Sequence, residues 1–303
     1  MISPRTVQLL SAAGLDPGHV ERIVRNAVDE DLDGGLDVTT VATVGETARA
    51  VADFASRAPG VAAGIPVAAA VLDVVSDGDA EIEFRVEDGA RVEPGTVLFT
   101  ASGRVRDLLT SERTALNLLS HLSGIATVTR RWVDAVEGTG AKIRDTRKTT
   151  PGLRRLEKYA VRCGGGVNHR MSLSDAAMVK DNHVVAAGGV IAAFDAVRKR
   201  WPDLPIEVEV DSLDQLLPAV DAGVELVLLD NFTPERMRAA VLLVGRNEPY
   251  GRTRLEASGG LTLDQARAAA ETGVDYLSVG ALTHSAPILD VGCDFRPVPP
   301  GAT

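Results

Sequence analysis

The apolar positions of the first 136 residues follow two different periods. Residues 1–33 show helical spacing, whereas residues 51–58 have the composition of a strand. The segment 82–103 combines strand-like stretches with a DG and a PG pair, which predicts two strands joined by tight turns. A long helical pattern then runs from about residue 107 to residue 136. Gly124 lies near its middle and marks either a break in the helix or a close helix contact.

The remainder of the chain alternates apolar segments of strand length with helix-like segments. The apolar segments are 142–146, 176–182, 206–210, 225–230, 254–260 and 275–280. Continuous apolar strands joined by crossover helices are typical of a parallel sheet that is buried on both faces. The number of repeats favours a β/α barrel, complete or incomplete, over an open doubly wound sheet. The chain also lacks a GxGxxG motif after a strand, which weakens a dinucleotide-binding interpretation.

Bulk composition excludes several classes of protein. The chain has 303 residues, of which 45% are hydrophobic and 24% are charged, which is ordinary for a globular protein. A net charge of −10 argues against general binding of nucleic acid. We find neither a secretory leader nor an apolar run of about 20 residues that would cross a membrane. Two cysteines in a chain of this length favour a reducing compartment, so we expect a cytoplasmic protein.

Positive charge is concentrated between Lys142 and Lys180, where ten basic residues face three acidic ones. Four of the ten have helical spacing and are expected on a solvated or interface face of a helix: Arg154, Arg155, Lys158 and Arg162. Four others flank apolar or glycine-rich segments instead: Arg147, Lys148, Arg170 and Lys180. A basic pocket within an acidic protein predicts a small ligand with several negative charges.

Polar or glycine residues follow each predicted strand, where β/α barrels hold their active sites. In chain order these are Arg147 and Lys148, Lys180, Glu209, Asp230, Ser258 to Gly260, and Gly280 with Ala281. The cations suit carboxylates and phosphates, and the two carboxylates suit sugar hydroxyls or Mg²⁺. Small residues let backbone N–H groups approach an anion closely. These strand ends therefore predict a site for a phosphosugar and a partner that bears carboxylates.

Several long motifs resemble the quinolinate phosphoribosyltransferase family. The stretch 145–183 begins with DTRKTTPGLRR, continues through CGGGVNHR and ends with MVKDNH. The other matching motifs are GLDVTT (35–40), TSERTALNLLSHLSGIAT (110–127), EVEVDS (207–212), LLDNF (228–232), LEASGG (255–260) and VDYLSVGALTHS (274–285). The resemblance covers essentially the whole chain.

The resemblance implies an α/β fold with two domains. Residues 1–122 with 286–303 would form an N-terminal α/β sandwich, and residues 123–285 an incomplete, seven-stranded α/β barrel of the type II phosphoribosyltransferase kind. It also implies a homodimer in which the partner subunit contributes an arginine, here Arg113, to the active site. A hexamer built from such dimers stays open.

The resemblance also implies roles for individual residues. Arg147, Arg170, Lys180 and Arg113 of the partner subunit would hold the two carboxylates of quinolinate, with His169 beside them. Lys148 and Lys180 would contact phosphoribosyl pyrophosphate, and Thr146 belongs to the same DTRK motif. Glu209 and Asp230 would bind the ribose and Mg²⁺, directly or through water. The 5′-phosphate would lie against Ser258, Gly259, Gly260, Val279, Gly280 and Ala281, and His284 either contacts a phosphate or caps a helix.

The implied reaction transfers phosphoribosyl to quinolinate with loss of CO₂, and forms nicotinate mononucleotide and pyrophosphate for NAD biosynthesis. Lys148, Lys180, Glu209 and Asp230 would be its catalytic residues. Two alternatives stay open: a paralogous phosphoribosyltransferase with another pyridine or aromatic acid, and a Schiff-base aldolase that uses Lys180. The hairpin at 82–103 also resembles a biotinyl or lipoyl carrier, but no lysine precedes Lys142.

Overall fold

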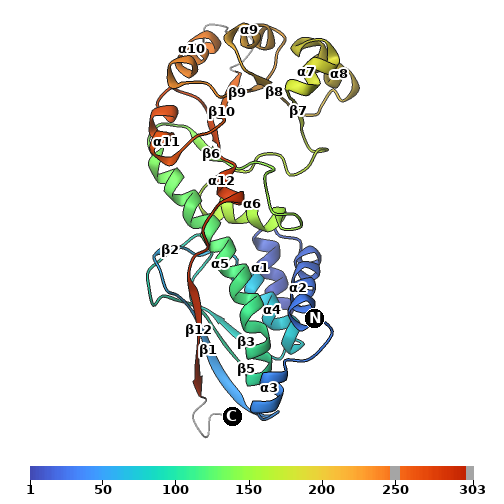
Figure 1. Ribbon diagram of the computed structural model, residues 1–303, viewed down its shortest axis with the longest axis vertical. Helices are drawn as coiled ribbons and strands as arrows, with labels where there is room; N and C mark the ends of the chain where they lie inside the picture. The colour runs from blue at the N-terminus through green and yellow to red at the C-terminus, as the bar shows by residue number, and fades with distance from the viewer. Residues whose placement is uncertain (246–252, 298–303) are drawn as a thin grey trace. The chain divides into compact units, whose positions relative to one another are not determined.

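A computed structural model describes residues 1–245 and 253–297 (Figure 1). The segment 245–254 is longer than a minimal connection between a helix and a strand, and most of it lies outside the described residues. The chain forms two compact units. Unit 1 comprises Met1–Arg130, Thr150–Gly165 and the chain from Ser285 onward, and unit 2 comprises Arg131–Thr149 and Gly166–His284. No helix within the described ranges is both long and apolar enough to cross a membrane.

Unit 1 contains a four-stranded sheet of order β12-β1-β5-β3, with β12 formed by the end of the chain. Its strands are β1 (Arg49–Ser56), β3 (Glu81–Phe84), β5 (Val97–Arg104) and β12 (Val291–Pro297), and β2 (Gly60–Val61) pairs separately with β4 (Arg91–Val92). The expected strands at 51–58 and 82–103 are confirmed, and β3 pairs with β5 antiparallel. The rings of Phe54 and Phe99 stack in the core beside this sheet, with their centroids 4.3 Å apart. The smaller helices of this unit are α1 (Pro4–Ala12), α2 (Pro17–Leu32), α3 (Val38–Thr43) and α4 (Ile65–Ser76).

The long helix predicted at 107–136 is α5 (Val105–Ala135), and it runs without a break. The expected domain boundary between residues 122 and 123 falls inside this helix. A Cβ atom on Gly124 would lie 2.1 Å from the carbonyl oxygen of Pro287 and 2.9 Å from the Cα of Ile288. Gly124 therefore marks a close contact with the returning chain, and the alternative of a helix break is wrong.

We expect Gly124→Ala to destabilise the protein by roughly 1–3 kcal/mol, because the added methyl group would overlap backbone atoms that cannot rotate away. The free energy of unfolding in urea measures this loss. Gly45→Ala is the matched control, since a Cβ at Gly45 meets nothing within 4 Å. Equal stability of the two variants would contradict the close contact.

Helix α6 (Arg154–Cys163) corrects one sequence-based expectation. Arg155 and Arg162 are exposed as expected, but Lys158 is completely buried. The adjacent Glu157 is also buried and accepts hydrogen bonds from His121 Nε2 (2.9 Å) and the Thr150 N–H (3.0 Å). Helical spacing gave the relative directions of the four basic side chains but not what packs against each of them.

Unit 2 is built on a parallel six-stranded sheet of order β6-β11-β10-β9-β8-β7. Its strands are β6 (Lys142–Arg144), β7 (Ala177–Val179), β8 (Ile206–Val210), β9 (Leu226–Asp230), β10 (Arg254–Ser258) and β11 (Tyr276–Ser278). The connecting helices are α7 (Asp181–Ala187), α8 (Val190–Arg200), α9 (Leu213–Asp221), α10 (Pro234–Gly245), α11 (Leu263–Ala270) and α12 (Ala281–His284). All six predicted strands are confirmed. In the described part of the chain a seventh extended segment pairs only as an isolated bridge, between Val167 and Arg144.

Candidate active site

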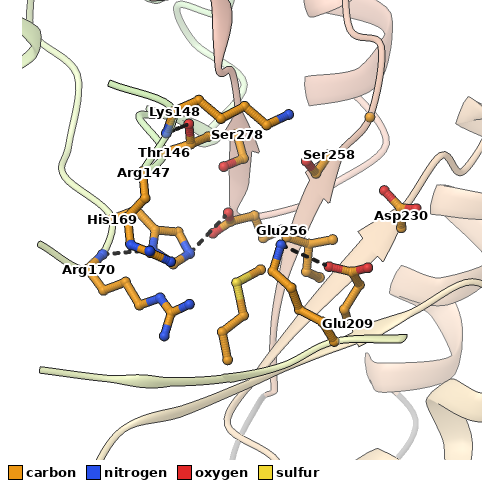
Figure 2. Close-up of a pocket in the computed structure, with 14 residues that line it drawn as sticks. Thr146, Arg147, Lys148, His169, Arg170, Glu209, Asp230, Glu256, Ser258 and Ser278 are labelled. Carbon is orange, nitrogen blue, oxygen red and sulfur yellow. Dashed lines mark hydrogen bonds and ion pairs between the residues drawn. The ribbon is translucent and has the colours of Figure 1, made fainter. Parts of the chain in front are cut away.

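A pocket of about 380 Å³ lies at the carboxyl ends of the parallel strands (Figure 2). Ten residues predicted from the sequence line it: Thr146, Arg147, Lys148, His169, Arg170, Lys180, Glu209, Asp230, Ser258 and Gly259. Met178, Leu228, Glu256 and Ser278 also line it and were not predicted. The gathering follows from topology, because the carboxyl ends of parallel strands meet at one edge of a sheet. In this register Ser258 of β10 is paired with Asp230 of β9.

Glu209 and Lys180 form an ion pair at one side of the pocket, with Lys180 Nζ 3.8 Å from Glu209 Oε2 (Figure 2). Burial raises the pKa of the Glu209 carboxyl group, Lys180 lowers it, and the negative charge of Asp230 raises it again. Two carboxylates that repel each other at the mouth of a pocket offer oxygen ligands of the kind that Mg²⁺ prefers. The pair therefore fits a divalent cation, since bound positive charge would relieve their repulsion.

Lys148 is anchored by its backbone at another side of the pocket. Its N–H donates to Thr146 Oγ1 (3.0 Å), and its carbonyl oxygen accepts from Thr283 Oγ1 (2.7 Å). A Cβ on Gly280 would lie 2.9 Å from Lys148 Cδ and 3.3 Å from His284 Nε2. Gly280 thus lets the Lys148 side chain cross the backbone closely, and it brings the 279–281 segment and His284 next to Lys148, although these residues do not line the pocket.

Asn231, which sequence reasoning missed, shapes the ends of β9 and β10. It has a left-handed backbone (φ 55°), its N–H donates to the Ser258 carbonyl (2.9 Å), and its side chain donates to Asp230 Oδ2 (2.8 Å). A Cβ on Gly259 would lie 2.2 Å from Asn231 Oδ1. Asparagine tolerates the left-handed region better than most residues, so the Asp-Asn pair after an apolar strand was an available signal. Gly260 also has a positive φ of 60° and is open around its Cα.

A group of mostly buried charged side chains adjoins the pocket, and two of them, His169 and Glu256, also line it. His169 Nε2 is 2.6 Å from Glu207 Oε2 and 3.8 Å from Glu256 Oε1. Glu256 also forms an ion pair with Arg144. Burial raises the pKa of Glu207 to about 7, although the positive charges of Arg144, Arg170 and Lys180 lower it. Burial also raises the pKa of Glu256, and the charge of Glu207 raises it further.

Neither Glu207 nor Glu256 was predicted as a site residue. Both stand in the middle of otherwise apolar strands, where a charge is costly unless it meets a partner, so their positions were a usable signal. Their partners come from distant parts of the sequence and could not be identified from the pattern. The predicted residue Arg113 lies exposed on α5 in unit 1 and is not among the residues that line the pocket.

Comparison with known proteins gives consistent matches along the chain. Residues 37–123 match the quinolinate phosphoribosyl transferase N-terminal domain, and residues 125–294 match the C-terminal domain of the same family. A nicotinate-nucleotide pyrophosphorylase (carboxylating) of Mycobacterium leprae is 56% identical over 273 residues, which cover 90% of this chain and 95% of that protein. A probable enzyme of the same name from Bacillus subtilis is 38% identical over 276 residues, covering 91% of this chain and 93% of that protein.

Solved structures agree with this result. A crystal structure of NadC from Streptococcus pyogenes superposes with a TM-score of 0.88 at 38% identity, covering 94% of this chain and 99% of that one. A nicotinate-nucleotide pyrophosphorylase from Francisella tularensis gives a TM-score of 0.86 at 37% identity, covering 92% of this chain and 96% of that one. The fold of both units is therefore shared with these proteins.

Proposed function

The chain belongs to the quinolinate phosphoribosyltransferase family, and we propose that the pocket of unit 2 is where it joins quinolinate to phosphoribosyl pyrophosphate. The products are nicotinate mononucleotide, CO₂ and pyrophosphate, and the reaction belongs to NAD biosynthesis. One observation supports this location most strongly: a single pocket combines four cationic side chains with two carboxylates at neighbouring strand ends. That combination suits a dicarboxylate and a phosphorylated sugar together.

The cations near the first two strands of unit 2 suit the carboxylates of quinolinate. Arg147 and Arg170 line the pocket, and a guanidinium group can bind a carboxylate through two parallel hydrogen bonds. Lys180 adds a compact positive charge between this region and Glu209. We assign these three residues to quinolinate, with Arg113 of the partner subunit completing the set in a homodimer.

The other side of the pocket suits phosphoribosyl pyrophosphate. Lys148 and Lys180 would contact its phosphates, and Glu209 and Asp230 would hold the ribose hydroxyls. The same two carboxylates would hold Mg²⁺, which would supply positive charge to the pyrophosphate group. The glycine-rich ends of β10 and β11 would receive the 5′-phosphate, because small residues leave their backbone N–H groups accessible.

Catalysis then rests on positioning and fixed charge. The pyridine nitrogen attacks C1 of the ribose as the bond from C1 to pyrophosphate breaks. Positive charge develops at the sugar, where Glu209 and Asp230 stabilise it. The pyridinium ring then accepts the electron pair of the bond to the 2-carboxylate, CO₂ leaves, and the ring carbon takes a proton from solvent. None of these steps requires a nucleophilic side chain. Arg147 and Arg170 would orient quinolinate. The two lysines would orient phosphoribosyl pyrophosphate and offer fixed positive charge to the departing pyrophosphate.

The assay that tests this function combines the protein with Mg²⁺, phosphoribosyl pyrophosphate and quinolinate. We expect nicotinate mononucleotide and CO₂ in equal amounts, and loss of turnover when a chelator removes Mg²⁺. Nicotinate in place of quinolinate should give no product, because it lacks the second carboxylate. Product from nicotinate without CO₂, or no product from quinolinate, would favour a paralogue with another pyridine or aromatic acid.

We place the enzyme in the cytoplasm. Cys163 and Cys293 are both free, as expected for a chain that folds in a reducing compartment.

A further inference from the structure

His169 lies at the bottom of the pocket with only 9% of its surface exposed, and both of its ring nitrogens have partners within the protein. Nδ1 is 2.7 Å from the backbone nitrogen of Arg170, and Nε2 is 2.6 Å from Glu207 Oε2. Figure 2 shows the contact between His169 and Arg170. The resemblance implied that His169 lies beside the carboxylate-binding residues, and the ring lines the pocket next to Arg170.

These two contacts determine where the ring carries its proton. A backbone N–H group can only donate, so Nδ1 must be the acceptor of the bond from Arg170. The proton of the ring is therefore on Nε2, and the carboxylate of Glu207 accepts it. Glu207 thus selects the tautomer that the Arg170 peptide needs.

No other carboxylate among these buried charged residues can replace Glu207 as the acceptor of the His169 Nε2–H. Glu256 Oε1 is the other carboxylate oxygen near Nε2, but it is 3.8 Å away, and Glu256 is already paired with Arg144. Glu207 itself is only 4% exposed, so water does not readily replace it as the acceptor.

The hydrogen-bonded chain ends at a pocket residue. The Arg170 peptide is held by His169 Nδ1, and the Arg170 guanidinium donates to the Ala176 carbonyl oxygen (2.8 Å) while lining the pocket. The His169 N–H in turn donates to Asp145 Oδ1 (2.8 Å), which fixes the segment from its other side. A change in the direction of the 169–170 peptide would therefore also move the guanidinium group of Arg170.

We propose that Glu207 is a positioning residue for quinolinate binding, which acts through the His169 tautomer on the direction of Arg170. The inference rests on the proposed function for its substrate. Removal of the acceptor should weaken the binding of quinolinate selectively, because the residues assigned to phosphoribosyl pyrophosphate are held by other contacts. A misplacement of about 1 Å in a binding group can cost on the order of 100-fold.

The test compares Glu207→Met with Glu207→Gln. Methionine has nearly the same length but cannot accept the Nε2–H, so we expect a rise of about 10- to 100-fold in the KM for quinolinate with little change in the KM for phosphoribosyl pyrophosphate. Glutamine can still accept through its carbonyl oxygen, and it should restore the KM for quinolinate to within a few-fold of wild type. Glu225→Met is the matched control, because Glu225 is an exposed glutamate immediately before β9.

A second measurement does not depend on substrate. The ¹⁵N shifts of the His169 ring, assigned by their loss in His169→Asn, should show a protonated Nε2 and an unprotonated Nδ1 in wild type and in Glu207→Gln. In Glu207→Met this pattern should change. An unchanged ring pattern in Glu207→Met, or equal rises in both KM values, would overturn the inference. An inactive wild-type enzyme with the expected ring pattern would instead contradict the proposed function.

Discussion

Lys148→Ala is expected to lower kcat by about 10²- to 10³-fold while the protein stays folded. The size follows from the usual cost of removing one fixed charge that stabilises a developing anion. The Lys148 side chain crosses Gly280 into the pocket, where it would meet the phosphates of phosphoribosyl pyrophosphate. Both hydrogen bonds that anchor the residue use its backbone, so alanine should keep the loop in place. Steady-state rates of nicotinate mononucleotide formation measure the effect.

The matched control is Lys142→Ala, since Lys142 is an exposed lysine at the start of β6, the strand that precedes Lys148. It should leave kcat unchanged, and both variants should have wild-type melting temperatures. A near-normal kcat in Lys148→Ala would remove Lys148 from the catalytic set, even if quinolinate remained the substrate.

The strands of unit 2 could be predicted because a buried parallel strand requires a continuous apolar run. The topology then determines which residues meet, because the carboxyl ends of all parallel strands lie at one edge of the sheet. That is why Glu209, Asp230 and Ser258 could be brought together from the sequence alone. The number of strands was less certain, because a segment such as Val167 that makes only one bridge has no apolar run to mark it.

Other features depend on packing between segments that are distant in the sequence. The pairing of His169 with Glu207 joins residues 38 positions apart, and the tautomer of the ring follows only from the geometry at both nitrogens. The Asp-Asn pair was a usable signal for a left-handed backbone at Asn231, but the packing of Gly259 against the Asn231 side chain could not be predicted from the pattern. Lys158 is a further example. Its place on a helix was predicted correctly, but its burial was not predicted.

The roles of single residues came from the family resemblance and not from periodicity. Periodicity and charge could place cations and carboxylates at the same edge of the predicted sheet. They could also suggest that the substrates are a phosphosugar and a second molecule that bears carboxylates. They could not distinguish a residue that touches substrate from one that orients its neighbour. His169 illustrates the difference, because its type and position fitted a ligand contact while its two nitrogens face the protein.

Arg113→Ala is expected to lower kcat/KM for quinolinate by roughly 100-fold, because a charged donor to a carboxylate is lost. Arg113 is exposed on α5, so the substitution should leave the melting temperature unchanged. Arg131→Ala is a suitable control, since Arg131 is an exposed arginine further along the same helix. The important question is whether Arg113 acts within its own subunit or in the site of its partner.

A hybrid dimer answers that question. One subunit carries Arg113→Ala and the other carries Lys148→Ala, and two different affinity tags allow the hybrid to be purified. If Arg113 acts across the interface, one of the two sites combines an intact Lys148 with an intact Arg113, and the hybrid should have about half of the wild-type activity. If Arg113 acts within its own subunit, both sites carry a defect, and a purified hybrid would be as inactive as the two parent variants.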